Sequence, residues 1–148
     1  MASTVFRRLH WAWAIPIGLL LAAAAAKGIM MLLPVPANLD LSTTRVSERG
    51  TFTATVVTGP VVVGEPMSWA FKLKASDGSV IDPSTLSLDG GMPQHGHGLP
   101  RAPSQASATN NGTFVFSGIE FSMRGWWVIN IHRTTASGAD QAVFNFQL

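Results

Sequence analysis

The sequence predicts an all-β domain, an immunoglobulin-like antiparallel β-sandwich, preceded by one N-terminal transmembrane helix. Three observations support this prediction: an apolar run near the start of the chain, short stretches of alternating apolar and polar residues after residue 40, and turn residues between those stretches. The chain has 148 residues, which leaves room for one domain of ordinary size and a short accessory segment.

The apolar run, "WAWAIPIGLLLAAAAAKGIMMLL", occupies residues 11–33. It has about the length that a helix needs to cross a hydrocarbon core, and Lys27 is its one charged residue. Arg7 and Arg8 precede the run closely. The positive-inside rule therefore places residues 1–10 in the cytoplasm and everything after the run on the far side of the membrane.

A cleaved signal peptide is the alternative interpretation of this segment, because Ala24 and Ala26 resemble a cleavage site before Lys27. We favour a retained anchor, since "GIMMLL" continues the apolar run past that lysine. Both interpretations export the C-terminal part. Residues 34–40, "PVPANLD", then form an extended linker, because each proline disfavours helix.

The exported domain is expected to span residues 41–148 and to contain about seven strands. In "SWAFKLK", for example, Trp69, Phe71 and Leu73 share one face, and Lys72 and Lys74 lie on the other. Runs of this kind at regular spacing are typical of a sandwich. The expected strands are residues 41–46, 51–57, 68–74, 85–88, 112–118, 126–132 and 142–148.

The connections between these strands also carry signals. Asp77 and Gly78 predict a hairpin turn. Gly118 permits a bulge, after which Ile119, Phe121 and Met123 take up the opposite parity. Residues 102–112, "APSQASATNNG", are polar and rich in turn formers, which predicts an exposed loop.

Composition excludes several functional classes. The chain has no cysteine, so neither a disulfide nor a thiolate metal site is possible. After residue 34 the chain has seven Lys and Arg and eight Asp and Glu. This near-neutral balance does not provide the excess of basic residues that nucleic-acid binding requires. No serine lies in a nucleophile elbow, and the acidic residues are scattered singly rather than paired as an acid and a base. We therefore interpret the domain as a binding or accessory module and not as an enzyme.

The stretch "MPQHGHG", residues 92–98, is the candidate metal site. The spacing of His95 and His97 points both imidazoles to the same side where the backbone is extended, and Met92 adds a thioether. Histidine and methionine without carboxylate suit copper, particularly Cu(I). Met123 is a further methionine that could approach from a neighbouring strand, whereas His132 has the parity of an exposed strand-end residue. Glycine-flanked histidines on a surface loop that binds no metal are the alternative.

Two tryptophans stand next to each other in "WWVINIH". Trp127 shares the parity of the apolar stripe and is expected in the core. Trp126 is expected at the sheet surface, where it covers the histidine loop or faces a partner.

Three stretches together, "VVVGEPMSWAFKLKASDGSVID", "MPQHGHGLPRAP" and "NGTFVFSGIEFSMRGWWVINI", resemble the YtkA-like domain family and, more distantly, the FixH-type membrane proteins. The resemblance extends from about Gly50 to Leu148. It implies a bacterial exported or membrane-anchored β-sandwich with one N-terminal transmembrane helix. FixH-type relatives are associated with copper handling and with maturation of haem-copper respiratory oxidases, which implies copper-ligand roles for Met92, His95, His97 and Met123.

Two hypotheses follow. The first is a single-pass protein of the bacterial inner membrane, whose periplasmic domain binds copper and delivers it to a partner. The second is a metal-free interaction module, an accessory subunit of a membrane complex such as a haem-copper oxidase, with Trp126 as an interface anchor.

Overall fold

The computed structural model describes residues 14–23, 25, 26, 28 and 34–148. An N-terminal unit ends at Val35, and a second unit extends from Pro36 to Leu148. In the N-terminal unit the described residues between 14 and 28 are α-helical, and their apolar side chains, Leu19 and Leu20 among them, are exposed.

Within the described ranges, no helix combines the length and the apolar character that a membrane span requires. The predicted anchor at residues 11–33 falls partly outside these ranges, and the predicted cytoplasmic segment, residues 1–10, falls wholly outside them. Both stay predictions.

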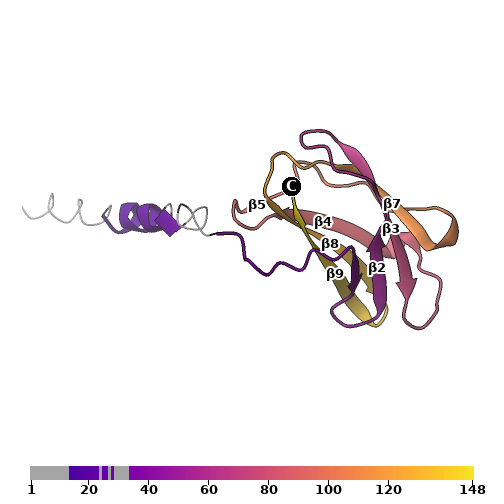
Figure 1. Ribbon diagram of the computed structural model, residues 1–148. Coiled ribbons are helices and arrows are strands. Elements are labelled where there is room, and N and C mark those ends of the chain that lie inside the picture. Colours follow the sequence, from indigo (N-terminus) through magenta and orange to yellow (C-terminus); the bar gives the residue numbers. More distant parts are fainter. Residues whose placement is uncertain (1–13, 24, 27, 29–33) are drawn as a thin grey trace, which may run out of the picture. The chain divides into compact units, whose positions relative to one another are not determined.

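The second unit is an antiparallel β-sandwich (Figure 1). Its strands are β1 (Thr44–Val46), β2 (Phe52–Val56), β3 (Met67–Ala75), β4 (Leu86–Met92), β5 (His97–Gly98), β6 (Ser107–Ala108), β7 (Thr113–Ile119), β8 (Trp126–Thr135) and β9 (Gly138–Gln147), with 3₁₀ turns η1 (Pro83–Thr85) and η2 (Asn110–Gly112). In this part of the chain, one sheet has the order β1-β2-β3-β7-β6 and the other the order β5-β4-β8-β9. The predicted sandwich is confirmed, and β2-β3-β7-β6 facing β4-β8-β9 repeats the strand order of immunoglobulin sandwiches.

Alternating side chains build one apolar interior between the sheets. On β3 the predicted parity is confirmed, because Trp69 and Phe71 are buried while Lys72 is exposed. Aromatic pairs cross from one sheet to the other: the ring centres of Trp69 and Phe146 are 4.7 Å apart, and those of Phe71 and Phe144 are 5.8 Å apart. Each such pair adds roughly 0.5–1.5 kcal/mol beyond the burial of its area, so these contacts fix how the sheets face each other.

The Asp77–Gly78 turn exists, but the predicted hairpin is wrong. The Gly78 amide donates to the Ala75 carbonyl, yet β3 and β4 belong to different sheets. Asp82 accepts a hydrogen bond from the Ser84 amide and Pro83 opens η1, so no strand forms directly after the turn. The connection therefore crosses to the second sheet before β4 begins.

The expected loop at residues 102–112 contains a short strand, which corrects the sequence-based prediction. Ser107 and Ala108 pair with β7, and Ala106 is buried beside them. A strand of two residues is too short to give an alternating pattern, so the polar composition of the segment concealed it.

The predicted bulge at Gly118 is confirmed. Met67 pairs with Ile119 and Trp69 with Phe116, so β7 contains one residue more than β3 over this span. Gly118 has a φ of +82°, a conformation that glycine adopts without strain.

A buried carboxylate joins the two sheets at one end. Asp140 of β9 accepts hydrogen bonds from the Ser47 hydroxyl (2.6 Å), the Thr51 hydroxyl (2.6 Å) and the Arg49 amide (2.9 Å), all in the turn between β1 and β2. Burial by itself would raise the pKa of Asp140. The hydrogen bonds from Ser47, Thr51 and Arg49 outweigh that effect and hold its pKa far below the ordinary value.

Replacing this carboxylate tests its contribution to stability. We expect Asp140→Asn to lower the free energy of unfolding by about 1–3 kcal/mol near neutral pH, because an amide nitrogen then faces donors. The depressed pKa of Asp140 means that its contribution is complete above about pH 4 and is lost as the pH falls further. Urea unfolding followed by circular dichroism should therefore show a stability gap between wild type and variant that narrows toward about pH 2.

The exposed Glu65 provides the matched control, since Glu65→Gln removes one carboxylate without such a network. A gap for Asp140→Asn that is no larger than that of the control, or one that does not change with pH, would contradict the assigned role.

Candidate metal-binding site

The "MPQHGHG" stretch forms the hairpin between β4 and β5. Met92 pairs with His97 across it, and the amides of His95 and Gly96 both donate to the Met92 carbonyl, at 3.1 and 2.9 Å. Gly96 has a φ of +65°, which a side chain at this position would strain. His95 thus lies in the turn and His97 in a strand, so the extended backbone on which the sequence-based expectation relied is absent here.

The turn nevertheless brings the two imidazoles together. The ring centres of His95 and His97 are 5.9 Å apart, with an angle of 31° between the ring planes. Two imidazoles that share one ion at about 2 Å per nitrogen have ring centres roughly 5–6 Å apart. His97 is exposed and His95 half-buried, so an ion can reach them from solvent.

A hydrogen bond defines the tautomer of His97. Its Nδ1 lies 3.1 Å from the Gly98 carbonyl oxygen, which can only accept, so Nδ1 carries the proton. The lone pair of Nε2 is then available. Histidines that bind metals are commonly oriented by such a bond from the second ring nitrogen.

Met92 is buried at the base of the hairpin, with 1% of its surface exposed. Its side chain lies on the same face as its cross-strand partner His97. Its methyl group packs on Gly125, where a Cβ would come within 2.7 Å of it. Gly125 therefore permits the close approach of the segment that also carries Met123.

The expected inward parity of Met123 is wrong. Ile119 and Phe121 are fully buried, but Met123 is 42% exposed, because the chain has left β7 and bends before β8. Its carbonyl accepts a hydrogen bond from Trp127 Nε1 at 3.0 Å. The backbone of Met123 thus lies beside the hairpin, while its side chain lies at the surface.

Trp127 is the neighbour of the histidines that sequence reasoning missed. Its burial was predicted and is confirmed, but it also makes an edge-on contact with His97, with ring centres 5.9 Å apart. The pairing of residues across the hairpin could have indicated this contact. His97 lies opposite Met92, whose side chain points into the domain, and Trp127 on β8 also points into the domain.

Trp126 lies on the outer face of the same sheet, half-buried, as predicted. Its Nε1 donates to the Asn145 side chain of β9 at 3.0 Å. His132 lies on the same strand, where its Nε2 is 3.0 Å from an Asp89 carboxylate oxygen. Neither residue is part of the His95–His97 pair.

Methionine sulfur is the further side-chain donor that the sequence offers beside the His95–His97 pair. Across the residues that the structure describes, no three His, Cys, Asp or Glu side chains gather closely enough to hold an ion. The two histidines and Met92 of the hairpin, with Met123 on the adjoining segment, are the donors that the fold brings to one end of the domain.

A family model described as YtkA-like matches residues 44–132. The match includes the hairpin, Trp127 and most of β8. No curated protein and no solved structure matches the chain.

The histidine tautomers provide a direct check on this geometry. In the neutral imidazole we expect His97 to carry its proton on Nδ1, which faces the Gly98 carbonyl. His132 should carry it on Nε2, which faces a carboxylate. Long-range ¹H–¹⁵N NMR spectra distinguish the two forms, and a His97 proton on Nε2 would contradict the orientation described here.

Proposed function

Because this chain belongs to the YtkA-like family, we propose that it is a membrane-anchored periplasmic accessory protein that binds copper as cargo and delivers it to a partner. The observation that supports this most is the His95–His97 pair, with Nε2 of His97 free to coordinate. We propose that the delivered copper serves the maturation of a respiratory oxidase. The proposal assigns no catalytic role to the domain.

The donor set favours Cu(I) over harder cations. Two imidazoles with the thioethers of Met92 and Met123 offer soft and borderline ligands without carboxylate. The exposure of His97 leaves one side of the pair open, which suits exchange of an ion with an acceptor. Trp127 contacts the His97 ring edge-on and restricts the movement of that ring.

The proposed location depends on the N-terminal segment. The apolar run of residues 11–33 suits a membrane anchor, and the helical residues described within it present apolar side chains outward. Arg7 and Arg8 orient that anchor with the domain on the periplasmic side.

Copper titration of the full-length chain in detergent micelles tests the proposal. We expect one copper ion per chain under reducing conditions, with NMR shifts in the rings of His95 and His97. The double variant His95→Ala, His97→Ala should weaken binding at least tenfold, about 1.4 kcal/mol. His132→Ala is the matched control, since it removes an imidazole outside the pair.

Equal affinity in the double variant and in wild type would refute the assigned site. Binding that never saturates in wild type would refute copper carriage itself. Circular dichroism must show the same β-sheet spectrum in all the variants.

An interaction module without metal is the second candidate function. The observation that favours it is an open depression of about 390 Å³ beside His97, whose lining includes Gly90, Gly91, Gly96 and Gly98. A surface so poor in side chains lets a partner approach the backbone closely. Trp126, on the outer face of the same sheet, is the candidate anchor for that partner.

Affinity purification in the presence of a strong chelator separates the two functions. An interaction module should retain its membrane complex after chelation and lose it on Trp126→Ala. Loss of the complex on chelation would exclude the second function.

A further inference from the structure

A second cavity lies at the opposite end of β8 from the histidine pair. It has a volume of about 440 Å³, within the range of small-molecule sites. Trp127, which contacts His97, and Arg133, which lines the cavity, are six residues apart on one strand. At about 3.3 Å per residue they are roughly 20 Å apart, so the cavity is separate from the proposed copper site. Its lining residues are Arg49, Gly50, Thr51, Ser76, Asp77, Arg133, Thr135, Ser137 and Gly138.

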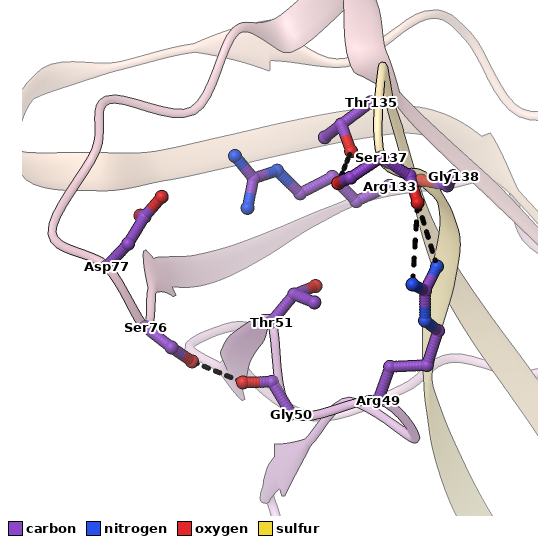
Figure 2. A pocket seen from close by; sticks show the side chains of 9 residues that line it. All are labelled: Arg49, Gly50, Thr51, Ser76, Asp77, Arg133, Thr135, Ser137 and Gly138. Carbon is purple, nitrogen blue, oxygen red and sulfur yellow. Dashed lines mark hydrogen bonds between the residues drawn. The ribbon is translucent and has the colours of Figure 1, made fainter.

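Arg133 has inward parity, continuing the stripe of Trp127, Ile129 and Ile131. Its Nε is buried and has no hydrogen-bond partner within the described residues. Figure 2 shows its guanidinium extending across the cavity in the direction of Asp77. A buried donor without an acceptor is costly, so the packing of β8, and not a hydrogen bond of this Nε, holds the guanidinium at the cavity.

The nearest expected counter-ion is already engaged. Asp140 is the cross-strand partner of Arg133, but its oxygens accept from Ser47, Thr51 and the Arg49 amide. No ion pair joins Arg133 to an acidic group in the part of the chain that the structure describes. Its charge therefore faces the cavity without a direct partner.

A second guanidinium lies on the other wall of the cavity. Arg49 donates to the Ser137 carbonyl at 3.4 Å (Figure 2). It also donates to the Ala139 carbonyl at 3.0 Å, so the guanidinium is held in place before any ligand arrives. The lining also has four hydroxyl groups, but each is already engaged within the protein: Thr51 donates to Asp140, Ser76 donates to the Gly50 carbonyl, and Thr135 and Ser137 bond to each other. The two guanidiniums are therefore the donors that a ligand would use.

Asp77 is the one carboxylate in this lining. Hydrogen bonds from Ser79 and, to a smaller extent, the charge of Arg133 lower the pKa of Asp77, so it stays ionised at neutral pH. Two arginines against one aspartate still leave the lining with a net positive charge.

We propose that this cavity binds a small oxyanion, a ligand with a carboxylate or phosphoryl group that accepts hydrogen bonds from Arg133 and Arg49. The planar fork of a guanidinium matches both groups, so the terminal nitrogens of Arg133 and Arg49 can donate charge-assisted hydrogen bonds to the ligand.

The arginine side-chain signals of the full-length chain report this binding directly. Inorganic phosphate and succinate serve as separate probes of the two ligand chemistries. We expect at least one of them to move the ¹H–¹⁵N signal of Arg133 Nε in a saturable, one-site manner, while that of the exposed Arg124 does not move. Failure of both probes to produce a saturable shift would overturn the proposal.

Two charge-matched variants separate a specific site from general attraction. Arg133→Gln should weaken binding of the effective probe at least tenfold, whereas Lys72→Gln, which removes an exposed cation from β3, should change it less than twofold. Equal losses in both variants would overturn the proposal. If Arg133→Gln does not fold, Arg133→Lys retains the charge without the guanidinium fork and should still weaken binding.

Copper titration of the folded Arg133 variant keeps this inference distinct from the proposed function. We expect its copper affinity to equal that of wild type, since the two sites lie at opposite ends of β8. Loss of copper binding together with anion binding would overturn the assignment of two separate sites.

Discussion

The alternation of side chains along β8 is the constraint on which both ends of the domain depend. Trp127, Ile129 and Ile131 face the interior and are fully buried. The same parity places Trp127 against His97 at one end and brings Arg133 into the cavity at the other. A shift of one residue would exchange the two faces of the strand, so the packing of the core fixes the position of both candidate sites.

Asp140 shows how one polar interaction shapes its surroundings. Its carboxylate oxygens accept hydrogen bonds from Ser47, Arg49 and Thr51. These bonds connect the turn between β1 and β2, in one sheet, to β9 in the other. Because Asp140 is engaged in these bonds, it forms no ion pair with Arg133, which lies opposite it on β8. Stability at this end of the sandwich and an unsatisfied guanidinium therefore have the same origin.

The hairpin of residues 92–98 shows how far sequence reasoning reaches at a site. Its residue types predicted a His and Met cluster, and the structure brings His95 and His97 together. The backbone that brings the two histidines together differs from the prediction, because it forms a turn and not an extended strand. Met92 is in the core and Met123 at the surface, a difference that depends on packing against Gly125 and on where β7 ends.

The sequence by itself determined the β-sandwich class, the inward parity of the long strands and the bulge at Gly118, because these follow from local alternation and backbone preference. Tertiary structure alone decided that the Asp77–Gly78 turn joins two sheets, that Ser107 and Ala108 form a strand, and that Arg133 lacks a partner. Each of these depends on residues distant in sequence, whose pairing is set by the packing of the whole domain and leaves no periodic signal in the chain.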